Sequence, residues 1–329
     1  MEEKEKILEV SHLKKYFKTG RGTLKAVDDV SFFIRKGETL GIVGESGCGK
    51  TTCGRTCIGI HNKTDGHVLY KGKDVHSLRG KERKEFTKEV QIIFQDPYSS
   101  LDPKMKVGDI IAEGLKAHHM CKSREEEQAR VKELLETVGL NAEHATRYVH
   151  EFSGGQRQRI MIAIALACQP RLLIADEPTT ALDVTIQADI IDLLKDIQKE
   201  FGMAVIMITH DLGIVAEICD EVSVVYAGRV IEHGTLEDIF KNTRHPYTEG
   251  LFNSLPNLEN RQAELKPIKG LMPDPSNLPK GCAFCPRCEY AMEICKTQKP
   301  PRTYRNDTHY VECHLYNKDN IHEGKVNIR

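Results

Sequence analysis

The chain has 329 residues, of which 40% are hydrophobic and 29% are charged, and its 47 basic and 48 acidic side chains leave a formal charge of −1. This composition excludes a wholly disordered chain and lacks the basic excess typical of nucleic-acid-binding proteins. The length favours one large domain plus a smaller one.

Neither a secretory signal nor a membrane span is expected. The first six residues, Met-Glu-Glu-Lys-Glu-Lys, contain no apolar core. The longest apolar run, Ile160 to Cys168, has nine residues, which is about half of what a membrane-spanning helix needs. We therefore expect a cytosolic protein that reaches a membrane only through a partner.

Short apolar runs alternate with amphipathic stretches over the first 245 residues, a pattern typical of an α/β domain. Runs that are apolar throughout indicate strands buried on both faces of a sheet. Apolar residues at helical spacing predict helices over 124–138 and 185–200. The predicted strands are 30–34, 39–43, 90–94, 172–175 and 204–209.

The composition changes near His245, because nine of the 13 prolines follow this residue. Residues 246–279 are expected to form an extended connector rather than a new core. Five of the 11 cysteines then fall within the 32 residues from Cys282 to Cys313. The sequence therefore predicts an α/β domain over residues 1–245 and a small, irregular, Cys-rich C-terminal extension over residues 246–329.

Residues 44–51, Gly-Glu-Ser-Gly-Cys-Gly-Lys-Thr, match the phosphate-binding loop G-x-x-x-x-G-K-[ST] and follow a predicted strand. The glycines allow a tight turn whose N–H groups point at phosphate oxygens, and the next helix adds its dipole. Lys50 supplies a positive charge for the β- and γ-phosphates, and Thr51 supplies a hydroxyl for Mg²⁺. The residues expected to bind ATP here are Gly44, Ser46, Gly47, Cys48, Gly49, Lys50, Thr51 and Thr52.

Cys48 lies inside this loop, beside Lys50 and a helix N-terminus. Both neighbours favour a thiolate. One hypothesis is therefore a reactive Cys48 that bound ATP protects from alkylation. The alternative is that a small residue simply fits at this position.

The strand 172–175 ends in two carboxylates. In P-loop ATPases such a strand places its terminal aspartate, here Asp176, beside Mg²⁺. Glu177 is then positioned to orient the attacking water. Farther upstream, Phe152-Ser153-Gly154-Gly155-Gln156 precedes a helix, with Ser153 as the expected N-cap. Its two glycines would let another phosphate approach the backbone.

The segment 152–156 resembles the signature motif of ABC ATPases, usually Leu-Ser-Gly-Gly-Gln, with Phe152 in the first position. The resemblance covers residues 7–245 and implies a P-loop ATPase domain with a helical signature subdomain. It also implies roles for residues outside the phosphate loop. Tyr16 would stack on adenine, Gln95 would contact Mg²⁺ and water, and His210 would contact the γ-phosphate. Asp183 (in Ala181-Leu182-Asp183) would lie in a loop that crosses a dimer interface, and the nucleotide of a second subunit would be bound by Ser153, Gly154, Gly155 and Gln156. Catalysis would then belong to Glu177, His210 and Gln95.

Residues 92–103 and 245–248 are similar to those of ATP-binding subunits of the oligopeptide/dipeptide (nickel) importers. The resemblance implies an ATPase dimer, formed with a homologous chain, that energises import at the cytoplasmic face of the membrane. Its partners would be two integral-membrane permeases and an extracytoplasmic substrate-binding protein. The cargo stays open, since relatives import nickel or glutathione. The alternative is a soluble ABC ATPase acting on DNA, ribosomes or iron–sulfur assembly, against which the single ATPase domain and the balanced charge argue.

The cysteine spacing, Cys282-x2-Cys285-x2-Cys288-x6-Cys295-x17-Cys313, indicates metal ligands in a segment too short to build a large core. Spacing alone leaves a zinc site and an iron–sulfur cluster open. The importer tails contain Gly-Cys-x-Phe-x-x-Arg-Cys followed by two further cysteines. This resemblance implies a structural [4Fe–4S] cluster on Cys282, Cys288, Cys295 and Cys313, with Cys285 as a spare thiol. A redox sensor that regulates the ATPase is the other hypothesis.

Overall fold

The computed structural model describes residues 5–20, 22–180, 182–254 and 267–317. The chain divides into two compact units, and each has strands and helices of its own. The first unit comprises residues 1–8, 33–39 and 69–209, and the second comprises residues 9–32, 40–68 and 210–329. The predicted boundary at residue 245 stays a prediction.

Three parallel strands form the sheet of the first unit. β6 (Val90–Ile93) pairs with β7 (Leu172–Asp176), which pairs with β8 (Ala204–Thr209). All residues of β7 and β8 are buried, which explains why these runs are apolar throughout. The strands predicted at 90–94, 172–175 and 204–209 are confirmed.

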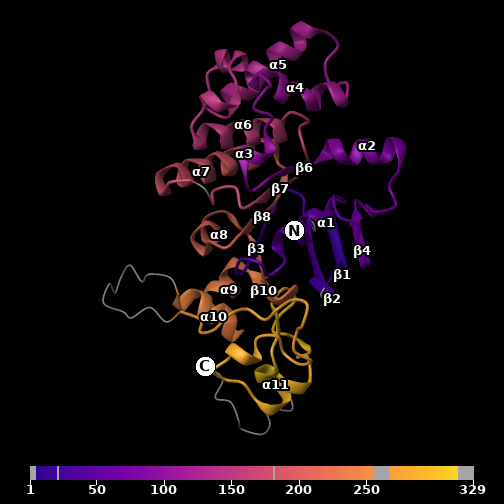
Figure 1. Ribbon diagram of the computed structural model, residues 1–329, viewed down its shortest axis with the longest axis vertical. Coiled ribbons are helices and arrows are strands. Elements are labelled where there is room, and N and C mark those ends of the chain that lie inside the picture. The colour runs from indigo at the N-terminus through magenta and orange to yellow at the C-terminus, as the bar shows by residue number, and fades with distance from the viewer. Residues whose placement is uncertain (1–4, 21, 181, 255–266, 318–329) are drawn as a thin grey trace. The chain divides into compact units, whose positions relative to one another are not determined.

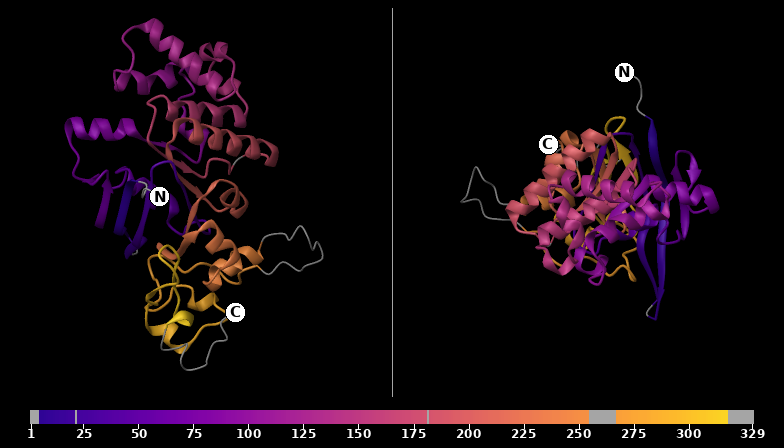
Figure 2. Two further views of the ribbon diagram at one scale, coloured as in Figure 1. Left: turned by 180° about the vertical axis from the view of Figure 1, so that it is seen from behind. Right: turned by 90° about the horizontal axis from the view of Figure 1, so that it is seen from above.

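Three helices of the first unit pack on one another and form its helical part (Figure 1 and Figure 2). They are α4 (Val107–Ala117), α5 (Arg124–Thr137) and α6 (Gly154–Leu166). Ser123 caps α5 by accepting a hydrogen bond from the N–H of Glu126. The cap and the apolar periodicity together explain why the prediction for 124–138 is confirmed.

The longest described helix of the first unit, α7 (Val184–Phe201), matches the pattern predicted over 185–200. It ends where Gly202 adopts the left-handed conformation at a φ of 59°. Strand β5 (Lys73–Asp74) pairs with the end of β4 (Asp65–Tyr70). The remaining elements of this unit are α2 (Gly80–Glu89), α3 (Pro97–Ser100), and the 3₁₀ turns η1 (Ala142–Thr146) and η2 (Val149–Glu151).

A mixed sheet runs through the second unit and includes strands of the C-terminal extension, residues 246–329, which we call the tail. β3 (Thr39–Val43) lies parallel to β9 (Glu221–Tyr226), and β9 is antiparallel to β10 (Arg229–Thr235). The next neighbour of β10 is β12 (Tyr310–Glu312), which pairs in turn with β11 (Arg302–Tyr304). Figure 1 shows this yellow C-terminal chain beside the orange segment that contains β10. The tail therefore covers the edge of β10.

The second unit also contains most of β1 (Lys6–Thr19) and β2 (Gly22–Arg35), which neighbour each other, and the start of β4 (Asp65–Tyr70), which lies beside β1. The strand predicted at 30–34 forms the end of β2. The remaining elements are α1 (Lys50–Cys57), α8 (Leu212–Ile218), α9 (Leu236–Lys241), α10 (Pro246–Asn253), η3 (Cys285–Arg287), α11 (Glu293–Thr297) and η4 (His314–Tyr316).

Helix α10 corrects the expectation of an extended connector over its first eight residues. His245 caps the helix by accepting a hydrogen bond from the N–H of Tyr247. Pro246 occupies the first turn, where its missing N–H removes no helical hydrogen bond. Pro246 therefore starts a helix at a position where the proline content of the sequence predicts irregular structure.

None of the helices in the described ranges is long and apolar enough to cross a membrane.

Candidate nucleotide site and its contacts with the tail

The predicted phosphate loop connects β3 to α1 within the second unit. Lys50 is only 4% exposed, and its ammonium donates to the carbonyl oxygens of Gly44 at 2.7 Å and Glu45 at 3.1 Å. Gly49 has a φ of 107°, and a Cβ there would lie 2.1 Å from the carbonyl oxygen of Ala26. The loop is therefore a tightly packed turn in which only glycine fits at position 49.

The hypothesis of a reactive thiolate at Cys48 is wrong. The side chain is buried, with 1% exposure, and burial raises the pKa of the thiol to about 11. Lys50 acts in the opposite direction, through its Nζ atom 4.0 Å from the sulfur and through its backbone N–H, but burial has the larger effect on the pKa. Cys48 is a small residue that fits, as the alternative held.

Tyr16, the predicted adenine partner, lies on β1 in the same unit as the loop. Its hydroxyl donates to Asp28, and the ammonium of Lys25 lies 5.7 Å from the centre of its ring. Burial alone would raise the pKa of Asp28, but hydrogen bonds from Tyr16 and Lys299 hold it below its ordinary value. The hydrogen bond to Asp28 therefore fixes the ring of Tyr16, and the ammonium of Lys25 lies near it.

The predicted catalytic carboxylate lies in the first unit, where β7 ends. Glu177 is 7% exposed, and its backbone adopts a positive φ of 49°. The side-chain amide of Gln95 and the hydroxyl of Thr180 both donate to its Oε2 atom, at 3.0 Å and 2.9 Å. Asp176, the preceding residue, is fully buried. The structure therefore brings Gln95, Asp176 and Glu177 together, and it adds Thr180, which the sequence reasoning missed.

The predicted signature segment begins α6. Ser153 is the N-cap, as expected: its hydroxyl accepts from the N–H of Gln156, whose side chain accepts from the N–H of Ser153. A Cβ on Gly155 would lie 2.6 Å from a side-chain methyl group of Ile186, so a larger residue there would displace Ile186. Gly154 opens the helix beside it. The guanidinium of Arg157, one turn on, lies 4.2 Å from the ring centre of Tyr98.

The two remaining predicted residues are exposed and lie at element boundaries. Asp183 precedes α7 at its N-cap position. Ala181, which belongs to the same predicted loop, lies outside the described residues. His210 follows β8 directly, and the next residue, Asp211, caps α8 through the N–H of Gly213. Tyr16, the phosphate loop and His210 belong to the second unit, whereas Gln95, Ser153, Asp176, Glu177 and Asp183 belong to the first.

The tail contacts the phosphate loop, and the sequence reasoning did not find this. The hydroxyl of Tyr247 accepts a hydrogen bond from the N–H of Glu45 at 2.9 Å. Arg287, within the Cys-rich segment, donates to both oxygens of the Glu45 carboxylate, at 2.6 Å and 2.9 Å. The only available signal was an arginine between two cysteines, which spacing assigned to a metal site.

A second connection holds the tail on β10. Glu232 is fully buried and accepts from the backbone N–H groups of Arg244 and His245 and lies 3.1 Å from the Nε2 atom of His309. His309 is itself fully buried. Burial lowers the pKa of His245 to about 3, so its ring is neutral. These contacts fix the tail against β10, whose sheet the tail extends through β12.

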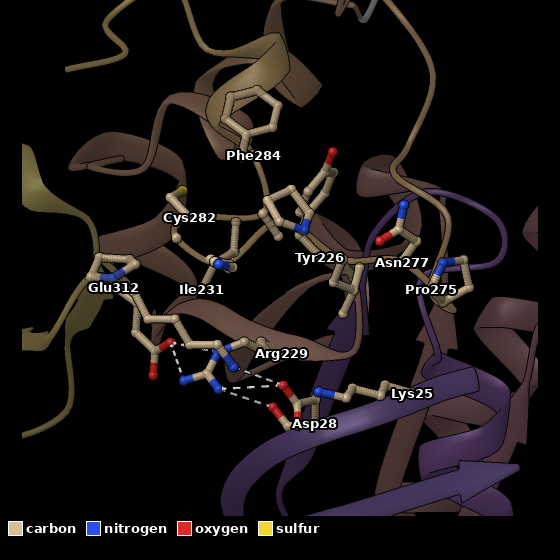
Figure 3. Close-up of a pocket in the computed structure, with 18 of the residues that line it drawn as sticks. Lys25, Asp28, Tyr226, Arg229, Ile231, Pro275, Asn277, Cys282, Phe284 and Glu312 are labelled. Carbon is tan, nitrogen blue, oxygen red and sulfur yellow. Dashed lines mark hydrogen bonds and ion pairs between the residues drawn. The ribbon is translucent and has the colours of Figure 1, made fainter. Parts of the chain in front are cut away.

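A cavity of about 380 Å³ lies between this tail and strands β2, β9 and β10 of the second unit. In Figure 3, Phe284 and Cys282 lie on one side of Tyr226, and Asn277 and Pro275 lie on the other. Arg229 lies below, between Glu312 at 3.0 Å and Asp28 at 4.0 Å (Figure 3). Arg229 is therefore paired with two carboxylates on the floor of the cavity.

The predicted metal ligands are near one another but not assembled. Among the residues that the structure describes, no group of three or more His, Cys, Asp or Glu side chains is placed to hold a metal ion. The iron–sulfur and zinc predictions are therefore not supported by the side-chain geometry. Burial raises the pKa of Cys282 and Cys288 to about 11 and that of Cys313 to about 12, and neighbouring cysteines add to each increase.

Backbone N–H groups act in the opposite direction on the same three sulfurs. Those of Phe284, Tyr290 and Leu315 each lower the pKa of the cysteine two residues before them. Amides directed at sulfur stabilise a thiolate, the form that binds metals. The donor chemistry of the segment thus suits a thiophilic metal, although the side chains are not arranged around one.

For magnesium, the chemistry of the predicted donor set is the available test. Mg²⁺ prefers oxygen ligands. Thr51 offers a hydroxyl, Gln95 an amide oxygen and Asp176 a carboxylate. Each of these oxygen donors is of a kind that suits the ion.

Known proteins share both the cassette and the tail. Residues 27–180 match the ABC transporter family, and residues 231–295 match the C-terminal region of oligopeptide/dipeptide transporters. The oligopeptide transport ATP-binding protein OppF of Bacillus subtilis is 55% identical over 253 residues, which cover 77% of this chain and 83% of that protein. AppF of the same organism is 47% identical over 323 residues, covering 95% of this chain and 98% of that protein.

The fold is also that of solved ATP-binding cassettes. The cassette MJ0796, in a dimeric post-hydrolysis state bound to ADP and Pi, matches with a TM-score of 0.64 at 28% identity, over 70% of this chain and 98% of that one. CbiO1 of Clostridium perfringens matches with a TM-score of 0.63 at 32% identity, over 72% of this chain and 92% of that one. Fold and motifs together define an ABC ATPase, an enzyme that hydrolyses ATP to power transport. Within that class, the chain belongs to the family of oligopeptide/dipeptide transport ATP-binding proteins.

Proposed function

We propose that this chain is the subunit that hydrolyses ATP to drive the import of oligopeptides or dipeptides. The observation that carries the proposal is the joining of a phosphate loop to an importer-type tail in one chain, through Arg287 and Glu45. The relatives are transport proteins by name, which does not favour a soluble ATPase acting on DNA, ribosomes or iron–sulfur assembly.

The nucleotide roles follow from the chemistry of each residue. Lys50 would pair with the β- and γ-phosphates once it leaves the carbonyls of Gly44 and Glu45, which hold it in the loop. Mg²⁺ would be held by Thr51, Gln95 and Asp176 and would neutralise charge on the phosphates. Glu177 would orient the attacking water, with Gln95 and Thr180 fixing its carboxylate.

The remaining roles require a second subunit. Ser153, Gly154, Gly155 and Gln156 would serve the nucleotide of a homologous ATPase chain, Asp183 would lie at the interface, His210 would contact the γ-phosphate, and Tyr16 would stack on adenine. The exposed positions of His210 and Asp183 are compatible with contacts of this kind. We place the dimer at the cytoplasmic face of the membrane, bound to two permeases that receive peptide from an extracytoplasmic binding protein.

A crosslinking experiment tests this placement. Tyr98 is 66% exposed on α3, where Asp96 caps the helix and the ring rests on Arg157. An exposed aromatic in the segment after Gln95 is a good candidate for a permease contact. A photo-crosslinker at position 98 should label a membrane subunit of the assembled transporter. As a matched control, a crosslinker at Tyr304, which is 61% exposed in the tail, should not. Crosslinks from position 98 only to another ATPase would contradict the placement.

We also propose that Cys282, Cys288, Cys295 and Cys313 bind a [4Fe–4S] cluster. The support is the set of backbone amides directed at three of these sulfurs, since such amides stabilise the thiolate form that binds metals. Full-length protein purified without oxygen should be brown and contain iron and acid-labile sulfide. Cys288→Ser should lose the colour and the matched Cys285→Ser should keep it. Zinc without iron would keep the ligands and exclude the cluster, and protein without metal would exclude both.

A further inference from the structure

Arg287 is held in one orientation by several partners. Its side chain is 4% exposed although the residue lies in the Cys-rich tail. Its Nε atom donates to the carbonyl oxygen of Lys269 at 2.9 Å, and Nη1 also reaches the hydroxyl of Tyr226 at 3.4 Å. With these contacts in place, the two Nη atoms point at the two carboxylate oxygens of Glu45. Lysine would keep the positive charge but could not reproduce the bidentate geometry of this planar guanidinium.

The turn that carries Arg287 is anchored in the second unit. Phe284, just before η3, is 4% exposed and packs edge-on against Tyr226 and Tyr247, with ring centres 5.3 Å and 5.4 Å away. Figure 3 shows Phe284 above Tyr226 at the cavity. Tyr247 in turn accepts the N–H of Glu45. The tail therefore holds Glu45 by its backbone and by its side chain.

Glu45 has an unfavourable charge for its position. It is the second residue of a loop that is built to receive a triphosphate, and its own carbonyl accepts from Lys50 and from the N–H of Cys48. A carboxylate beside bound phosphates repels them unless a cation neutralises it. Arg287 supplies this cation from the tail and fixes the carboxylate in place.

We infer that Arg287 is a positioning residue for ATP binding: it neutralises Glu45 and fixes the carboxylate in place, so that the phosphate loop can accept the nucleotide. This inference rests on the proposed nucleotide site. It makes the tail part of the ATP-binding machinery, acting through Glu45 without contacting the nucleotide. Loss of Arg287 should then weaken ATP binding, whereas loss of the Glu45 charge should cancel much of that defect.

The test measures ATP affinity of the full-length chain, and KM and kcat for ATP in the assembled transporter. Arg287→Gln should raise the Kd and KM about tenfold and change kcat less than twofold. Arg287→Lys should give an intermediate KM. The double variant Arg287→Gln/Glu45→Gln should return to within about threefold of the wild-type KM, which a merely structural role for Arg287 would not produce, because two structural losses add.

Two controls separate the possible failures. Arg302→Gln removes another tail ion pair, to Glu312 at 3.3 Å, without touching the loop, and should leave the KM unchanged. Melting temperatures of all variants show whether each one folds, and Arg287→Lys remains informative if Arg287→Gln does not. The inference is overturned if Arg287→Gln and Arg302→Gln have the same KM, or if the double variant is as weak as Arg287→Gln. If Lys50→Ala binds ATP normally, the proposed nucleotide site itself is wrong.

Discussion

Glu177→Gln should bind ATP with unchanged affinity while hydrolysis falls by roughly 10²- to 10⁴-fold, the range for loss of a general base. The amide has the same size as the carboxylate, so the contacts of the side chain with Gln95 and Thr180 can be kept with one oxygen. The phosphate loop, in the other unit, is unaltered. Equilibrium ATP binding and single-turnover hydrolysis in the assembled transporter measure the two effects separately.

Thr180→Val is the matched control for this variant. It removes one hydrogen bond to Glu177 at similar volume and leaves the carboxylate in place. Hydrolysis should fall by about tenfold or less, as expected for loss of one neutral hydrogen-bond donor. If Glu177→Gln hydrolyses ATP at the normal rate, or only as slowly as Thr180→Val, another group orients the water.

Gly49→Ala should reduce ATP binding by at least about 100-fold. The new methyl group would lie 2.1 Å from the carbonyl oxygen of Ala26, and at a φ of 107° the backbone would be strained by any side chain. The loop must therefore change its turn, which moves the N–H groups away from the phosphate position. Isothermal titration of the full-length protein with Mg-ATP measures the loss.

Gly202→Ala provides the comparison, because Gly202 has a φ of 59° and a Cβ there would meet no atom within 4 Å. It should cost about 1 kcal/mol of stability through the backbone alone. Its ATP affinity should equal that of the wild type. Normal ATP binding by Gly49→Ala would mean that the nucleotide binds elsewhere.

The buried strands and the long amphipathic helices could be predicted because burial determines which of their residues are apolar, and this pattern is visible in the local sequence. β7 and β8 are apolar since both faces are covered, and α5 carries its cap and its apolar stripe in its own sequence. The phosphate loop and the N-cap at Ser153 could also be predicted from the sequence, because the local backbone conformation limits which residue types can occupy these positions.

Contacts between residues far apart in the chain could not be predicted from the local sequence. Glu45 and Arg287 are separated by 242 positions, and nothing in either neighbourhood specifies the other. Cys48 was misjudged for the same reason: its charged neighbours are visible in the sequence, whereas the tertiary burial that raises its pKa is not. Thr180 was missed because its role depends on where the chain turns after β7.

The pairing of β12 with β10 has a consequence for how the protein is made. β10 is antiparallel to β9 on one side and to β12 on the other. During synthesis, β10 leaves the ribosome long before β12 does, so one of its edges exposes unpaired backbone groups while the tail is still being translated. Such an edge can pair with any strand that reaches it. Nascent chains that stop before Tyr310 therefore release a sheet prone to aggregation, and completion of β12 covers the exposed edge of β10.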